Sequence, residues 1–101
     1  MWVFAMFDLP VQTQAARAEY TRFRTLLLRC GFDMMQFSVY ARYYPSEEAS
    51  AAHRKIIKKG LPPDGQVRLL MVTDKQYGKM EIFHGKKHQP TELPPDQMML
   101  F

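Results

Sequence analysis

The chain has 101 residues, of which 47% are hydrophobic and 24% charged, proportions that suit one globular domain. Its single cysteine excludes a disulfide framework, and no apolar run reaches the roughly 18 residues that a membrane span needs. The formal net charge of +4 at pH 7 is compatible with a polyanionic partner, although a solvated basic surface is the commoner cause of such a value. Because the first residues carry no basic leader, we expect a cytoplasmic protein that does not enter a membrane.

The first predicted element is a strand from Trp2 to Asp8. Six consecutive apolar residues precede Asp8, and a Leu-Pro pair then stops the strand. This pattern is typical of a strand buried on both faces. Asp8 is therefore expected at the carboxyl end of a central strand, where α/β-type sheets tend to present functional side chains. The alternative is that Asp8 caps the helix that follows, because Asp is a favoured N-cap residue.

A helix is predicted from about Gln14 to Cys30, with Thr13 as its N-cap and Gly31 as the residue that ends it. Apolar residues recur at the spacing of one helix face, at Ala16, Tyr20, Phe23, Leu27 and Cys30. Basic residues flank this face, with Arg17 and Arg24 on one side and Arg22 and Arg29 on the other.

Residues 32–44 are dense in aromatic and β-branched residues, which favour strands. From Met35 to Tyr43 the odd positions are apolar and the even positions are more polar, which is the period-two pattern of a half-buried sheet. The segment is longer than the usual strand of about five or six residues. We therefore expect a short strand, a tight turn near Gln36 to Ser38, and a longer strand to Tyr44.

A second helix is predicted between Ser46, its N-cap, and Gly60. Its apolar face is thin and consists of Ala49, Ala52 and Ile56, with His53 beside it. Further strands are predicted at residues 66–73 and 79–84. The sequence beyond position 84 is polar and proline-rich until an apolar end at 97–101. We therefore divide the chain into a domain at 1–84 and, at 85–101, a linker and tail that docks on a partner or on the dimer.

The order strand, helix, strand, strand, helix, strand predicts an α+β protein with the ferredoxin-like βαββαβ architecture and one additional C-terminal strand. This fold places both helices on one face of a four-stranded antiparallel sheet and leaves the other face open. RNA-recognition modules cover that face with bases through a Lys/Arg-Gly-aromatic motif, which is absent from this sequence. We therefore expect a two-fold dimer with its sheets packed together, in which the C-terminal strand pairs with the partner chain.

The sequence lacks the short motifs of phosphate-binding loops, serine hydrolases and zinc proteases, and its three histidines lie on different predicted elements. Asp8 is the leading candidate for chemistry, and Asp74 is the one rival carboxylate that also follows a strand. Mg²⁺ is usually bound by one or two carboxylates together with waters and substrate phosphates. A two-fold axis passing Asp8 would bring two copies of it to one ion, which would polarise a phosphoryl oxygen and lower the pKa of a bound water.

Three segments occur in a characteristic order: MFDLP at residues 6–10, GF with MMQFSVYAR at 31–42, and GQVRLLMVTD at 65–74 before a Gln-Tyr pair. Together they resemble the CRISPR-associated endoribonuclease family, the small core subunit of the spacer-acquisition complex, and in particular its type II branch. The resemblance covers nearly the whole chain. It implies a ferredoxin-like fold, a homodimer, and Mg²⁺-dependent phosphodiesterase activity on RNA or double-stranded DNA. It also implies that the dimer bridges two dimers of the spacer integrase and holds the prespacer duplex.

The same resemblance assigns roles to individual residues. The Asp that closes the first strand, Asp8 here, is implied as the catalytic residue and metal ligand. Phe37 and Ser38 belong to a segment near the dimer interface and active site. The resemblance further places near nucleic acid the helix that carries Arg17, Arg22 and Arg24. Phe7 stands where many members have a tyrosine, so any role of that hydroxyl is absent.

Two functions from different classes follow. The first is a homodimeric Mg²⁺-dependent endonuclease that takes part in CRISPR spacer acquisition. The second is a non-catalytic adaptor that binds duplex DNA and the integrase, and one protein can combine both. A toxin-type ribonuclease of the same fold is a further alternative.

Overall fold

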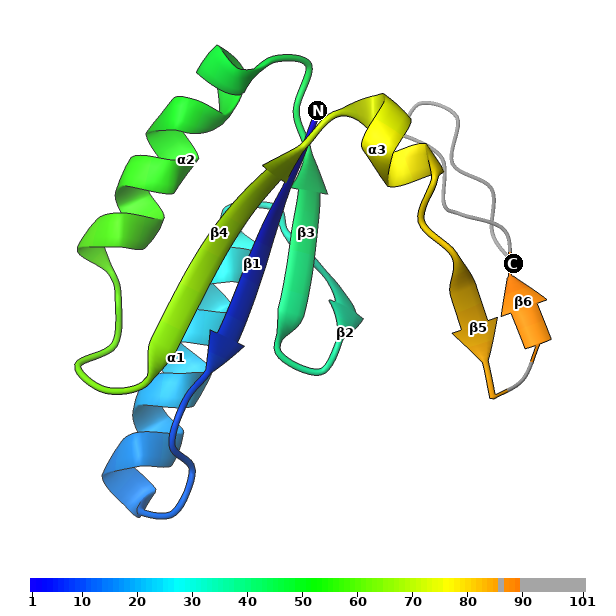
Figure 1. The fold of residues 1–101 in the computed structure, drawn as a ribbon. Coiled ribbons are helices and arrows are strands. Elements are labelled where there is room, and N and C mark those ends of the chain that lie inside the picture. Colours follow the sequence, from blue (N-terminus) through cyan, green and yellow to red (C-terminus); the bar gives the residue numbers. More distant parts are fainter. Residues whose placement is uncertain (86, 90–101) are drawn as a thin grey trace.

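The computed structural model describes residues 1–85 and 87–89, with the arrangement shown in Figure 1. In chain order, its elements are β1 (Trp2–Asp8), α1 (Gln14–Arg29), β2 (Asp33–Gln36), β3 (Val39–Tyr43), α2 (Glu47–Lys59), β4 (Gln66–Val72), α3 (Asp74–Gly78), β5 (Ile82–His84) and β6 (Lys87–Gln89). None of the helices described has an apolar stretch of the length that crossing a bilayer requires.

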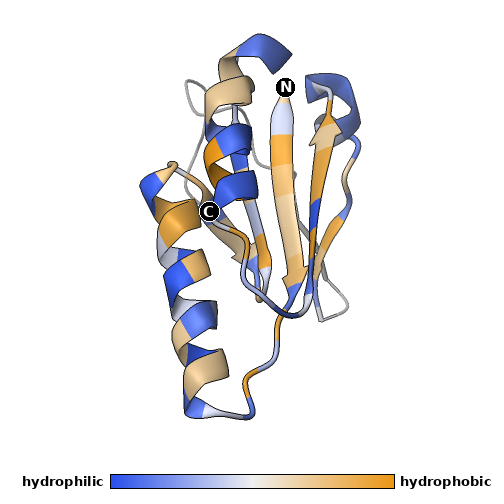
Figure 2. Cartoon of the chain, turned by 90° about the vertical axis from the view of Figure 1, so that its left-hand side faces the viewer, coloured by the Kyte–Doolittle hydropathy of each residue, from blue (hydrophilic) through white to orange (hydrophobic). Residues whose placement is uncertain are grey.

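Strands β1 to β4 form one antiparallel sheet in the order β2-β3-β1-β4, so β1 is central. Figure 2 shows α1 and α2 on the same side of this sheet. The arrangement confirms the predicted α+β, ferredoxin-like fold. The two-fold dimer stays a prediction. The predicted turn between the second and third strands is also present, with Ser38 in the left-handed region at φ 61°.

The main core lies between the sheet and the helices. Val3, Ala5 and Phe7 of β1 face Phe23 and Leu27 of α1, and all five side chains are buried. α1 begins at Gln14 as predicted, because Thr13 caps it through its side chain, and it ends at Arg29, with the predicted last residue Cys30 as its C-cap. The apolar stripe of this helix is therefore the side that packs on β1.

The buried side of α2 differs from the predicted one. Ser50 and Ile57 are fully buried, whereas Ile56, on the predicted apolar face, is 45% exposed. Ser50 is tolerated in the core because its hydroxyl donates to the carbonyl oxygen of Glu47 at 2.7 Å and accepts from Nε of Arg54 at 2.9 Å. The prediction was wrong because it used hydropathy alone, which favours burial of isoleucine over serine. It could not take into account that the hydroxyl of Ser50 is hydrogen-bonded in the core.

Two tyrosines at the even positions of the predicted strand, one in β3 and one just after it, are also more buried than their polarity suggests. Tyr40 and Tyr44 are 1% and 3% exposed and belong to the core on the helix side. Each hydroxyl has a partner, since Nε of Arg24 donates to Tyr40 at 2.8 Å and the Tyr44 hydroxyl lies 2.7 Å from Nδ1 of His53. Tyrosine can thus fill the core while its polar end stays hydrogen-bonded.

The open face of the sheet is covered only in part. Trp2 lies there under the short helix α3, with its ring stacked on Tyr77 at a centroid distance of 4.0 Å. The sequence did not predict α3, which a Thr73 capping box initiates. β5 is present as the predicted additional strand, but it pairs with β6 in a hairpin that stands apart from the main sheet (Figure 1).

The predicted boundary between residues 84 and 85 falls in the turn of this hairpin. Most of the predicted tail, residues 90–101, lies outside the described residues. The division into 1–84 and 85–101 therefore stays a prediction.

Candidate active site

Asp8 is the last residue of β1 and lies opposite Gln66 of β4. Because Val3, Ala5 and Phe7 point to the helices, the alternation of a strand places Asp8 on the open face, together with Met6. Asp8 is exposed, and its carboxylate makes no hydrogen bond or ion pair with any residue in the described part of the chain. Asp8 is therefore a carboxylate at the end of the central strand to which no other described residue is paired.

The alternative that Asp8 caps the first helix is wrong. The N-cap is Thr13, whose Oγ1 accepts a hydrogen bond from the Ala16 amide at 3.0 Å. Four residues separate Asp8 from that cap, and they turn the chain from the sheet to the helix layer. Capping therefore does not explain the carboxylate.

Asp74 lies at the other end of the sheet and does not rival Asp8. β4 runs antiparallel to β1, so Val72 pairs with Trp2 and Asp74 follows near the start of β1. Its carboxylate pairs with the terminal ammonium group of Met1, and it lies in the first turn of α3, where an acidic side chain is favourable. Asp74 thus has a structural role of its own.

Gly65, in the loop before β4, packs closely against the backbone of Asp8 and Leu9. It has φ 89°, and a Cβ built on it would lie 2.5 Å from the carbonyl oxygen of Asp8 and 3.0 Å from Cα of Leu9. Only a residue without a side chain fits this approach. The loop before β4 therefore clamps the end of β1 and sets the position of Asp8.

The β2–β3 turn brings Ser38 and Phe37 to the same edge. The Phe7 amide donates to the carbonyl oxygen of Ser38 at 3.0 Å, one residue before Asp8. The Ser38 hydroxyl also lies 3.4 Å from the hydroxyl of Tyr20 on α1, and Phe37 is 87% exposed. The fold thus brings the turn that carries Phe37 and Ser38 to the end of β1, although this turn lies far from Asp8 in the sequence.

The three candidate nucleic-acid arginines separate into two positions on α1. Arg17 and Arg22 line a shallow hollow on the outside of the helix, which Gln14, Ala18 and Thr21 complete. Arg24 is instead tied to the sheet through Tyr40. Arg22 is paired with Glu19 at 3.0 Å, and this hydrogen bond lowers the pKa of the Glu19 carboxyl. Arg17 and Arg22 are therefore the pair that one ligand could contact together.

Sequence reasoning missed a polar cluster that joins the end of β3 to α2 and to the end of α1. NH1 of Arg42 donates to the Cys30 carbonyl oxygen at 2.5 Å and lies 3.1 Å from Nδ1 of His53. Because a guanidinium only donates, Nδ1 must accept, so His53 is neutral and the Tyr44 hydroxyl donates to it as well. Burial and the nearby Arg42 charge both lower the pKa of His53. The spacing of these residues along the sequence gives no sign of the cluster, because the fold brings them together from different elements.

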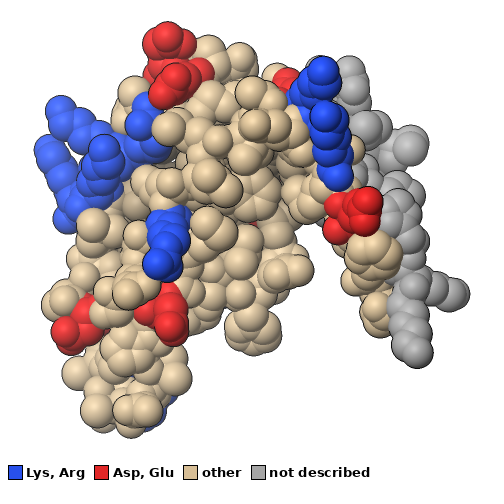
Figure 3. Space-filling view, viewed as in Figure 1, with Lys and Arg blue, Asp and Glu red and all other residues tan. Residues whose placement is uncertain are grey.

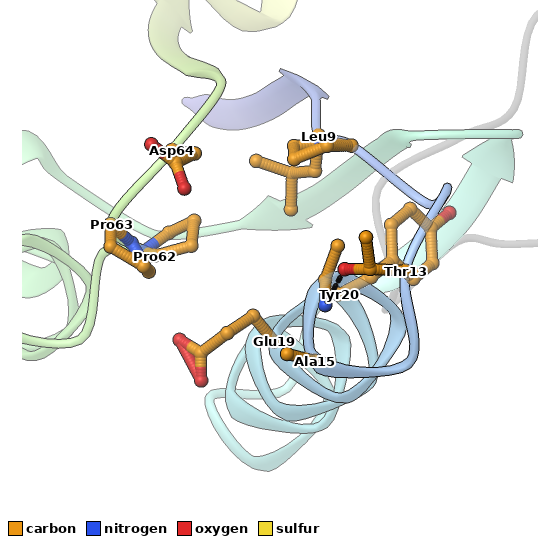
Figure 4. Close-up of a pocket in the computed structure, with 10 residues that line it drawn as sticks. Leu9, Thr13, Ala15, Glu19, Tyr20, Pro62, Pro63 and Asp64 are labelled. Carbon is orange, nitrogen blue, oxygen red and sulfur yellow. Dashed lines mark hydrogen bonds between the residues drawn. The ribbon is translucent and has the colours of Figure 1, made fainter.

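A hollow of about 160 Å³ lies near Asp8 but on the helix side of the sheet. Figure 4 shows Leu9, Pro62 and Pro63 around it, facing the first turns of α1, with Glu19 and Asp64 at its rim. Asp8 does not line it. The hollow is therefore separate from the Asp8 side chain, which lies on the open face of the sheet.

The described residues contain no group of three or more His, Cys, Asp or Glu side chains that could hold a metal ion. At the open-face end of β1, the carboxylate that one chain offers to an ion is that of Asp8. This donor suits a hard cation such as Mg²⁺, which keeps several waters, better than zinc, which takes three or four protein ligands.

Comparison with known proteins gives a consistent family match. Residues 1–80 match the model of the family described as CRISPR associated protein Cas2. The chain is 50% identical over its full length to the CRISPR-associated endoribonuclease Cas2 of Parvibaculum lavamentivorans, all of which is covered. It is also 43% and 45% identical, again over the full chain, to the proteins of that name from Flavobacterium psychrophilum and Paracidovorax avenae, of which 88% and 94% are covered.

Proposed function

The chain belongs to the Cas2 family of CRISPR-associated proteins, and on this premise we propose that it is a Mg²⁺-dependent endonuclease that works as a homodimer. The proposed substrates are phosphodiester bonds of RNA or double-stranded DNA, and the proposed setting is CRISPR spacer acquisition. The names of the relatives as endoribonucleases support the reaction class. The observation that carries the proposal is the exposed carboxylate of Asp8 at the end of the central strand, which pairs with none of the residues that the structure describes.

The donor set fits a Mg²⁺ ion only if something else completes it. Asp8 supplies one oxygen ligand, and waters, a phosphate oxygen and a second Asp8 would supply the rest. A bound ion would offset negative charge on the phosphate and lower the pKa of a coordinated water. The role of the chain itself is to hold the carboxylate in place, through the β1–β4 register and the close contact of Gly65.

The open face of the sheet supports a dimer. Beside Asp8 it carries Phe4 and Met6, which are half-buried, and Leu70, which is 48% exposed. An apolar face of this kind gains free energy when a second copy covers it. A two-fold axis through this face would pack the sheets together and bring the two Asp8 side chains toward each other.

A second role, that of a DNA-binding adaptor, draws support from the basic surface. Arg17 and Arg22 are exposed on the outside of α1. Figure 3 shows further basic side chains gathered over α2, where Lys55, Lys58 and Lys59 are exposed. We propose that such side chains hold the backbone of a prespacer duplex while the dimer bridges two integrase dimers. Phosphate contacts of this kind need no particular base sequence.

The experiment that tests the nuclease is the replacement Asp8→Asn, with Asp64→Asn as a matched control on the neighbouring loop. Asn keeps the shape of Asp but loses the charged ligand. We expect Asp8→Asn to abolish Mg²⁺-dependent cleavage of labelled RNA and duplex DNA, while thermal stability and dimerisation in analytical ultracentrifugation are retained. Asp64→Asn should cleave normally. Full activity of Asp8→Asn, or a wild-type protein that is strictly monomeric, would contradict the proposal.

A further inference from the structure

Arg68 shares the open face with Asp8. In the β1–β4 register Asp8 lies opposite Gln66 and Met6 lies opposite Arg68. Alternate residues of a strand point to the same face, so Met6, Asp8, Gln66 and Arg68 all lie on that side. Arg68 is thus the diagonal cross-strand neighbour of Asp8, at a typical Cα separation of about 7–8 Å that a long side chain can span.

The Arg68 guanidinium has no partner within the described residues. Its side chain is exposed and makes no hydrogen bond or ion pair there, even with the nearby Asp8. Among the described arginines only Arg29 shares this property, and Arg29 lies in the last turn of α1, where a cation is favourable. No such explanation applies to Arg68 in the middle of β4.

The surroundings of Arg68 make its charge costly if this face is covered. Met6 lies opposite it, and Leu70 follows it on the same face. A charge enclosed among such side chains needs an opposite charge close by. A phosphodiester brought to Asp8 would be repelled by its carboxylate, because both groups are negative. A phosphate bound between Arg68 and Asp8 would supply the negative charge that Arg68 lacks, and Arg68 would offset this repulsion.

We propose that Arg68 binds a non-bridging oxygen of the phosphodiester that is presented to Asp8. Its planar guanidinium can donate two parallel hydrogen bonds to a phosphate, which a lysine ammonium cannot reproduce. Arg68 would hold the substrate against the β1–β4 edge and offset the repulsion between phosphate and carboxylate. This inference rests on the proposed nuclease function and adds a substrate-binding residue to it.

The test compares Arg68→Ala and Arg68→Lys with Lys75→Ala, which removes an exposed cation from α3 at the other end of the sheet. Binding of a short labelled DNA duplex is measured in EDTA over a series of salt concentrations. We expect Arg68→Ala to reduce the slope of log K against log salt by about 0.9, the value for one lost phosphate contact, and Lys75→Ala to leave it unchanged. Arg68→Lys should keep the slope, because it keeps the charge.

Cleavage with Mg²⁺ gives the second readout. Arg68→Ala should lower kcat/KM on the order of 10²-fold, and Arg68→Lys should restore only part of it, because the paired hydrogen bonds are lost. Normal cleavage and an unchanged salt slope in Arg68→Ala, with Asp8→Asn inactive, would overturn the role of Arg68 and leave the nuclease standing. A reduced slope in Arg68→Ala, together with a wild-type protein that never cleaves, would support the phosphate contact and reject the nuclease. Dissociation of the dimer in Arg68→Ala would overturn the proposal, because it would assign Arg68 to an ion pair between subunits.

Discussion

Gly65 and Asp8 meet at a point where the backbone of one leaves no room for a side chain on the other. Gly65 adopts φ 89°, and its α-carbon faces the carbonyl oxygen of Asp8 and the backbone of Leu9. The carboxylate proposed for catalysis is therefore positioned by a glycine that lies far from it in sequence.

Replacing Gly65 by Ala should disturb both stability and activity. The left-handed backbone alone costs about 1–2 kcal/mol for a residue with a Cβ, and the clash with the Asp8 backbone adds to it. Gly31→Ala is a control away from Asp8, because Gly31 has a similar φ of 82° but its added Cβ would meet side-chain atoms of Arg42 and not the backbone of β1. In urea unfolding Gly65→Ala should lose more stability than Gly31→Ala, and it alone should cleave more slowly. Equal losses and equal activities would argue against the clamp.

Reversing the charges at Arg17 and Arg22 should weaken duplex binding. The double variant Arg17→Glu/Arg22→Glu removes two exposed cations from one hollow, and each lost phosphate contact lowers the salt slope by about 0.9. The fold should survive, because an exposed ion pair such as Arg22–Glu19 adds little to the stability of a protein. Fluorescence anisotropy in EDTA measures the effect, with Lys75→Glu as the control. An unchanged slope would exclude these arginines from the interface.

Arg24→Ala should lower the free energy of unfolding more than Arg22→Ala does. Arg24 donates to the hydroxyl of Tyr40, which is only 1% exposed, so its loss leaves a buried polar group without a partner. We expect a loss of about 1–2 kcal/mol in urea unfolding, against about 0.5 kcal/mol or less for Arg22→Ala. The double variant Arg24→Ala/Tyr40→Phe should recover part of the loss, since it removes both polar partners. Equal effects of the two single arginine variants would count against this assignment.

The free energy of unfolding should decrease as the pH is lowered, because His53 becomes protonated. Burial and Arg42 hold the pKa of His53 below its unfolded value of about 6.5, so the unfolded chain binds the proton more readily. The contribution of the neutral His53 is complete above about pH 6.5, and it decreases as the pH falls from there toward the lowered pKa of the folded state. Urea unfolding at a series of pH values measures this slope. His53→Gln should flatten it, and a slope unchanged by the substitution would assign it to other groups.

Much of the fold could be predicted because the relevant signals are local. A run of apolar residues before Asp8-Leu-Pro predicts β1, and Thr13 and Gly31 mark the limits of α1. The break near Ser38 follows from strand length. α3 was missed because it has five residues and is held by the stack of Tyr77 on Trp2, a contact between distant segments. The buried face of α2 was missed because Ser50 is satisfied only by its hydrogen bonds.

The sequence by itself determined the elements, their order, the ferredoxin-like architecture and the resemblance to one family, because caps, turns and hydrophobic periods depend on neighbours along the chain. Only the tertiary structure decided which charged groups meet. It separated Asp74 from Asp8, placed Ser38 and Gly65 beside the end of β1, joined His53 to Tyr44, and put Arg68 on the face of Asp8. The physical reason is that strand register and helix facing are set by packing between distant segments, and a register shift of one residue would move every side chain of a strand to the other face.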